Sequence, residues 1–129
     1  MFTLEQIDDI HHRLGTMERF PDYVRALGEI GVVTYDSYLT DGHSEYFAND
    51  GQSLVSDAVH DVLPVADASD RARVVEHLRR HELGETSYIE MSTGLAQGGV
   101  EKWTVDTAAM TLTFRDTQGR PLVSEPIGP

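Results

Sequence analysis

The stretch from Gly98 to Gly119 constrains the fold more than any other part of the chain. It begins with two glycines, which end a helix because glycine adopts positive φ without a steric clash. A first run then alternates between two sets of side chains, namely Val100, Lys102 and Thr104 against Glu101, Trp103 and Val105. After a turn at 106–108, a second run places its apolar side chains on one face: Met110, Leu112 and Phe114. This period of two predicts an antiparallel hairpin with one buried face.

Four helices are predicted to cover that face, because apolar side chains recur at helical spacing in four other segments. The predicted helices run from a capping Thr3 to Gly15, from Pro21 to Gly31, from a capping Ser69 to Gly84 and from a capping Thr86 to Gly98. Further strands are predicted at 32–39, 45–49, 52–56 and 121–125, with an additional edge strand at 59–65. Residues 1–129 should therefore form a single α+β domain, with four helices packed on antiparallel strands.

The order helix, helix, strands occurs twice and indicates an internal duplication, with halves at 1–66 and 67–129. The segment His11-His12-Arg13-Leu14-Gly15 resembles Arg80-His81-Glu82-Leu83-Gly84, and Tyr23-Val24 resembles Tyr88-Ile89. The alternative is that helix ends and strand starts look alike in any α+β protein. A duplication predicts approximate two-fold packing of the halves, with His12 and His81 in matching places.

The charge of the chain excludes several kinds of partner. Twenty-two acids against 10 bases give a net charge of −12. Between Arg25 and Arg71 there is no Lys or Arg, and the acids there are Glu29, Asp36, Asp41, Glu45, Asp50, Asp57, Asp61, Asp67 and Asp70. Such a surface repels nucleic acid and anionic lipid, so we expect neither as a direct partner. It is either a solvated face or a surface that binds a basic protein by imitating nucleic acid.

Composition also indicates the compartment. The absence of cysteine excludes disulfides and thiolate metal sites. No apolar run approaches the roughly 20 residues that span a bilayer, and the first ten residues lack the features of a signal peptide. We therefore expect a cytoplasmic protein.

Two histidines suggest a metal site. His77 and His81 are four residues apart on a predicted helix, so both can point at one ion. A third ligand would have to come from Asp41, His43 or Glu45. No HExxH pattern surrounds the pair, and the neighbouring Arg79 and Arg80 disfavour a cation. The alternative is that these histidines are hydrogen-bonded or solvated side chains.

The densest polar cluster is Asp41-Gly42-His43-Ser44-Glu45, in a predicted loop between strands, where sites often lie. The same residues are also typical of a β-turn. Among the aromatic residues, Tyr46 and Trp103 belong either to the core or to a ligand pocket between sheet and helices. No nucleophile elbow or phosphate-binding loop is present. The candidate ligand-binding residues are Asp41, His43, Glu45, Tyr46 and Trp103, and we expect no catalytic residue and no cofactor.

Several longer sequence segments resemble those of a known family. They are Gly42-His43-Ser44-Glu45-Tyr46-Phe47, Gly84-Glu85-Thr86-Ser87-Tyr88, Gly99-Val100-Glu101-Lys102-Trp103-Thr104-Val105-Asp106, Met110-Thr111 and Glu125-Pro126-Ile127. The chain resembles, nearly end to end, the YdfO-like (YbcV-like) family of small bacterial and prophage-borne proteins, loosely labelled phage envelope protein. The resemblance implies an α+β fold, an intracellular location and a mobile-element ancestry, with no catalytic residues to carry over.

Three hypotheses of function follow. The leading one is a non-enzymatic binding or interaction protein of prophage-type accessory origin, acting as a homodimer. The second is an acidic inhibitor that mimics nucleic acid and occupies a basic host protein. The third is a small metal-dependent enzyme or ligand-binding protein that uses the region of His43, His77 and His81.

Overall fold

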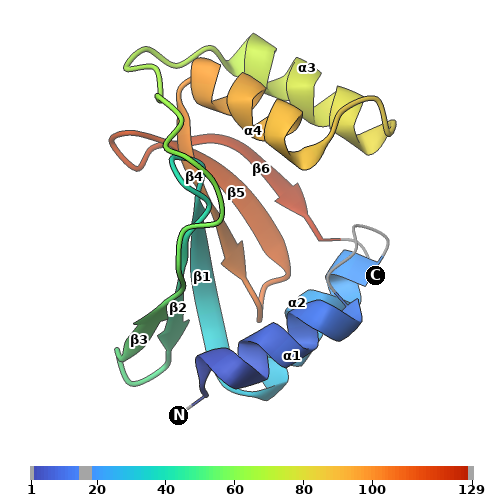
Figure 1. Ribbon diagram of the computed structural model, residues 1–129, viewed down its shortest axis with the longest axis vertical. Coiled ribbons are helices and arrows are strands. Elements are labelled where there is room, and N and C mark those ends of the chain that lie inside the picture. Colours follow the sequence, from blue (N-terminus) through green and yellow to red (C-terminus); the bar gives the residue numbers. More distant parts are fainter. Residues whose placement is uncertain (1, 15–18, 128–129) are drawn as a thin grey trace.

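Six antiparallel strands form one sheet, and four helices lie in two pairs, one at each end of the strands (Figure 1). The computed structural model describes residues 2–14 and 19–127. The helices are α1 (Leu4–Leu14), α2 (Phe20–Glu29), α3 (Arg71–Glu82) and α4 (Tyr88–Gln97). The strands are β1 (Val32–Tyr38), β2 (Ser44–Ala48), β3 (Ser53–Val55), β4 (Val100–Asp106), β5 (Thr111–Asp116) and β6 (Pro121–Pro126). The predicted single α+β domain is confirmed.

The helix starts follow from local hydrogen bonds. At α1, the Gln6 N–H donates to Thr3 Oγ1 at 3.2 Å and the Thr3 N–H donates to Gln6 Oε1 at 2.8 Å, as the sequence predicts. Pro21 lies in the first turn of α2, also as predicted. The predicted end of the first helix, Gly15, lies outside the described residues.

Two predicted caps are wrong by one residue. Asp70, not Ser69, caps α3, because the Asp70 carboxylate accepts from the Arg73 N–H at 3.1 Å. Ser87, not Thr86, caps α4, because Ser87 and Glu90 exchange side-chain and backbone hydrogen bonds in a capping box.

The strands occur close to their predicted ranges, but the predicted edge strand at 59–65 is wrong. The N–H groups of Val59 and His60 both donate to the Asp41 carbonyl, instead of alternating along a ladder. Val100 also differs from expectation. A register shift between Val100 and Lys102 turns Val100 to the side of Trp103, where it is fully buried. Met110 lies in the turn, at φ 55°, and not in a strand.

The strand order is β3-β2-β1-β4-β5-β6, with β1 and β4 antiparallel at the centre. Each half of the chain thus contributes two helices and three strands, and the order is symmetric about the β1–β4 ladder. This arrangement is what a duplication would produce, and the duplication itself stays a prediction.

The core divides into two clusters, one beneath each helix pair. The cluster between the sheet and α1 and α2 includes Val24 and Leu27 of α2 and Tyr35 and Val105 of the strands. The cluster between the sheet and α3 and α4 includes Val74 and Leu95 of these helices and Val100 and Phe114 of the strands. Trp103 and Leu112 pack against both clusters. They therefore lie at the boundary between the parts of the sheet that the two helix pairs cover.

Candidate functional site

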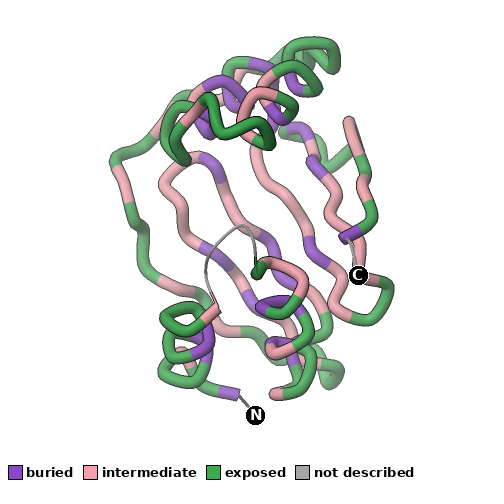
Figure 2. Tube along the Cα trace, turned by 90° about the vertical axis from the view of Figure 1, so that its right-hand side faces the viewer, coloured by how far each residue is buried: buried purple, intermediate pink, exposed green. Residues whose placement is uncertain are grey.

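The helix side of the sheet is less covered in its middle than at its two ends. Ser37, Trp103, Leu112 and Glu125 lie on this side and are only half-buried, although the first three belong to inner strands of the sheet. We call these four residues the seam. Figure 2 views the sheet from this side and shows half-buried stretches of strand between the helix pairs. A continuous helical layer would have buried a tryptophan in this position.

Strand register places the seam residues as neighbours across the sheet. Ser37 pairs with Trp103 across the β1–β4 ladder, and Leu112 pairs with Glu125 across the β5–β6 ladder. Ser37 also shares a 2.8 Å hydrogen bond between hydroxyls with Ser44 on β2. The seam therefore runs across the sheet from a pair of hydroxyls, past an indole ring and an isobutyl group, to a carboxylate.

Aromatic rings extend the seam toward the surface. The Trp103 ring lies 6.1 Å from Phe114 and 6.4 Å from Tyr88, both edge-on. The Tyr88 ring in turn lies 6.2 Å from His60. Tyr88 is 43% exposed at the start of α4, so the ring series leads from solvent to the centre of the sheet.

Glu125 is the charged member of the seam. Burial raises the pKa of its carboxyl group, and the nearby carboxylate of Glu82, at the end of α3, raises it further. No basic side chain in residues 2–14 or 19–127 forms an ion pair with Glu125. The carboxylate is thus partly desolvated without compensation by a positive charge.

Of the other predicted ligand-binding residues, Tyr46 shares the helix side but is closed off. It is buried beside Tyr35, with ring centroids 5.3 Å apart, and burial raises the pKa of its phenol. The structure therefore brings Trp103 to a half-exposed position and leaves Tyr46 in the core.

Asp41, His43 and Glu45 lie on or beside the opposite face, which no described helix covers. The His43 ring stacks on Tyr38 at 4.4 Å, and Asp41 accepts hydrogen bonds from the His43 backbone and ring. These two bonds hold the pKa of Asp41 below its usual range. Glu45 accepts from Ser53 on the neighbouring strand at 2.9 Å. Asp41 and His43 are thus brought together, as the sequence cluster predicts, but the sheet separates them from Trp103.

A polar network continues across this open face. Lys102 Nζ donates to Asp36 Oδ2 at 3.1 Å and lies 5.3 Å from the centre of the Tyr38 ring. Thr104 donates to the other Asp36 oxygen at 2.6 Å and accepts from Arg115 Nε at 3.0 Å. Each of these groups is satisfied by its neighbours, so the network is typical of a structural element of the sheet.

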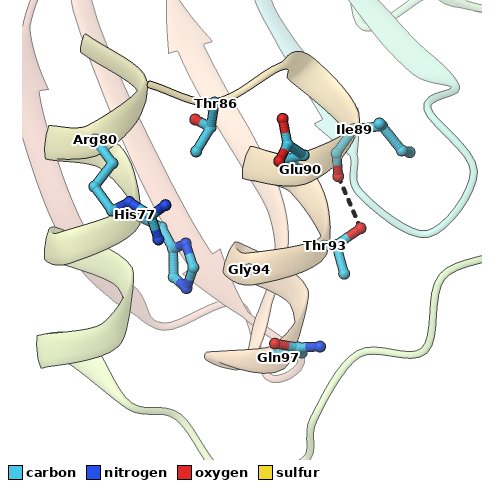
Figure 3. Close-up of a pocket in the computed structure, with 8 residues that line it drawn as sticks. All are labelled: His77, Arg80, Thr86, Ile89, Glu90, Thr93, Gly94 and Gln97. Carbon is cyan, nitrogen blue, oxygen red and sulfur yellow. Dashed lines mark hydrogen bonds between the residues drawn. The ribbon is translucent and has the colours of Figure 1, made fainter. Parts of the chain in front are cut away.

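Both predicted metal residues belong to α3, and His77 lies at its contact with α4 (Figure 3). His77 and Arg80 help to line a shallow groove of about 320 Å³ there. His77 packs against Gly94, and its Nδ1 atom is buried without a partner among the described groups. His81 Nδ1 instead faces the Thr86 carbonyl at 3.0 Å. In the described part of the chain no three His, Asp or Glu side chains gather as a metal site would require.

Comparison with known proteins identifies the family. Residues 8–126 match the family model described as "Protein of unknown function (DUF1398)". The chain belongs to the DUF1398 family. No curated protein matches it. Among the described helices of this DUF1398 member, none has the length and apolar character needed to cross a membrane.

Sequence reasoning missed three members of the seam in this DUF1398 protein. Leu112 was visible as an apolar strand residue, but Ser37 belonged to no motif, and Glu125 belonged only to a segment that indicated the family and no ligand. The available signal was the alternation of β6, which places Glu125 on the same face as Val123, where an apolar residue would be expected. An acid at an inward position of a strand is such a signal.

Proposed function

We propose that this protein is a non-enzymatic binding protein of prophage-type accessory origin, and that it holds a small molecule at the seam. The observation that carries the proposal is the half-exposed Trp103 on a central strand, between two separate hydrophobic clusters. Binding sites commonly combine apolar and aromatic walls with a few polar groups. The seam offers an indole ring, a leucine, hydroxyls and one carboxylate. The resemblance to prophage-borne proteins supports the accessory role.

The second hypothesis, an acidic mimic of nucleic acid, has less support. Five of the nine acids between Arg25 and Arg71 accept hydrogen bonds within the chain: Asp36, Asp41, Glu45, Asp50 and Asp70. They also lie on different elements, namely the open sheet face, the β1–β2 turn, the β2–β3 turn and the start of α3. A mimic needs its acids free and regularly spaced along one surface.

The metal hypothesis also has less support than binding at the seam. His77 and His81 offer two nitrogen ligands, whereas catalytic zinc sites use three protein ligands. The groove beside His77 contains one carboxylate, Glu90, whose side chain already accepts from the Ser87 N–H at 2.9 Å.

Native mass spectrometry of the full chain, purified from its own host, tests the proposal. We expect a bound molecule of discrete mass that is released on mild unfolding. The Trp103→Leu variant should lose this molecule, because leucine removes the ring but keeps an apolar side chain. Phe47→Leu makes the same kind of change on a different strand, β2, and should retain it.

A ligand that survives Trp103→Leu, or a chain that neither carries a ligand nor binds one that is added, would contradict binding at the seam. The same spectrum reports the oligomer. We propose a homodimer, so the apo mass should be twice that of the 14.4 kDa chain.

A further inference from the structure

Resting on the proposed binding function, the seam also points to the class of its ligand. We propose that the molecule is a small organic amine, whose apolar or aromatic part lies on Trp103 and Leu112 and whose ammonium group faces Glu125. The proposal joins three observations: a half-exposed indole ring, a half-buried carboxylate on the same side of the sheet, and the absence of a cation beside that carboxylate in the described residues.

Geometry relates the two ends of the site. From Trp103 to Glu125 the sheet extends two strands across and two residues along. With strands about 4.8 Å apart and a rise of about 3.4 Å per residue, the two Cα atoms are roughly 12 Å apart. Both side chains project from the same face of the sheet, so a short arylalkyl amine lying along that face has the length to contact both. Leu112 lies between them, paired directly with Glu125.

Electrostatics favours a cation over an anion or a neutral molecule. Glu82 lies close enough to act on the Glu125 carboxyl, and it lies in the last turn of α3, where the helix dipole is negative. The two arginines of that turn pair with other acids, Arg79 with Glu76 and Arg80 with Glu85. An ammonium group would compensate this potential. The electron-rich faces of Trp103 and Tyr88 also attract cations. The net charge of −12 favours the approach of a cation from solution.

Two other buried carboxylates and the groove between α3 and α4 do not offer the same combination within the described residues. The carboxylates of Asp36 and Asp116 are already bound by Lys102 and Arg120. The groove between α3 and α4 includes Arg80, which would repel an amine. Glu125 is therefore the carboxylate best placed to receive an external positive charge beside an aromatic surface.

Three probes of nearly equal shape test the assignment: 2-phenylethylamine, 2-phenylethanol and 3-phenylpropanoate. Trp103 is the only tryptophan, so its emission on excitation at long wavelength reports binding at the seam. We expect saturable binding of the amine, at least about tenfold tighter than of the alcohol, and no binding of the acid. Glu125→Gln should abolish the preference for the amine. Glu45→Gln removes the same charge from β2, and should leave the preference intact.

Each outcome separates the ligand class from the binding function. Equal or tighter binding of the alcohol or the acid, or a preference that survives Glu125→Gln, would overturn the amine assignment. If the host-purified protein releases a neutral or acidic molecule from the seam, the binding function stands and the amine assignment fails. If the protein is ligand-free and none of the three probes binds, both fail. A released amine would support both.

Discussion

At the scale of single residues, the open face of the sheet holds a buried charge that depends on one partner. Asp36 is 9% exposed; it accepts from the Thr104 hydroxyl, and its one positively charged partner among the described residues is Lys102, the only lysine of the chain. Burial lowers the pKa of Lys102, but the hydrogen bond and charge of Asp36 outweigh this effect and raise it overall. The positive form of the lysine is therefore held in place by the aspartate.

We predict that Lys102→Met lowers the free energy of unfolding by about 1–3 kcal/mol, because it leaves the Asp36 carboxylate buried without its cation. Urea denaturation at pH 7 measures the loss. The double variant Asp36→Asn/Lys102→Met should recover part of it. Arg13→Met, which removes an exposed pair with Asp9 in α1, should cost less than about 0.5 kcal/mol. Equal losses for the two single variants would contradict the prediction.

A second residue-scale prediction concerns Glu125. Its pKa is raised in the folded state, so the folded chain binds more protons than the unfolded chain once the pH exceeds the usual glutamate value of about 4.3. Stability therefore falls as the pH rises through the raised pKa. Glu125→Gln should stabilise the ligand-free protein at pH 7, by no more than about 1 kcal/mol because the group is partly solvated. The gain should vanish near pH 4.

Thermal unfolding of the ligand-free protein at both pH values measures this difference. Glu45→Gln provides the control and should not stabilise the protein at pH 7, because it replaces the charged acceptor of the Ser53 hydroxyl by a weaker, neutral amide oxygen. A destabilising Glu125→Gln at pH 7 would show that the carboxylate has a favourable partner after all.

At the scale of elements, the turn from α4 into β4 requires glycine for two reasons at once. Gly99 has φ +91°, and a Cβ there would approach the Ala68 carbonyl oxygen to 2.9 Å and the Ser69 Cα to 2.8 Å. Gly119 has a similar φ, +79°, but nothing lies within 4 Å of its Cβ position. Comparing substitutions at Gly99 and Gly119 therefore separates the cost of backbone strain from the cost of steric crowding.

We predict that Gly119→Ala costs about 1–2 kcal/mol of stability, from positive φ alone. Gly99→Ala should cost clearly more, because the start of α3 must also move away from β4. Chemical denaturation of both variants measures the difference. Equal costs would mean that residues 68–69 can move without loss of stability, and that their contact with Gly99 does not fix α3 to the sheet.

Most elements could be predicted from the sequence because their signals are local. The capping pair Thr3 and Gln6, the glycines that end helices and the alternation of 111–116 each operate within a few residues. The strand predicted at 59–65 was wrong because the apolar content of this segment resembles that of a strand, while its N–H groups donate to carbonyls of the β1–β2 turn. The predicted face of Val100 was wrong because a bulge shifts the alternation of side chains by one residue.

The candidate site was less predictable for the same reason. Asp41 and His43 are two residues apart, so their contact follows from sequence proximity. Ser37, Trp103 and Glu125 become neighbours only through the register of three ladders. Whether Trp103 is covered depends further on where each helix pair lies, and no pattern in the sequence encodes that distance.

At the scale of the whole molecule, the two halves share one sheet and should unfold together. The β1–β4 ladder is their common boundary, and Trp103 and Leu112 pack against both clusters. Leu27→Ala, at a fully buried position on the inner face of α2, should lower stability by about 2–5 kcal/mol. Its urea transition should shift equally when followed by Trp103 fluorescence and by far-ultraviolet circular dichroism. Separate transitions for the two probes would show that the halves are independent.

The central ladder has a further consequence for synthesis on the ribosome. The Lys102–Asp36 contact spans 66 residues, so β1 cannot acquire its second neighbour until β4 has been made. At about 5–20 residues per second, the nascent first half waits several seconds with an unpaired strand edge. Such an edge can pair with another chain. The many acids between Arg25 and Arg71 would keep neighbouring nascent chains apart during that interval, because like charges repel.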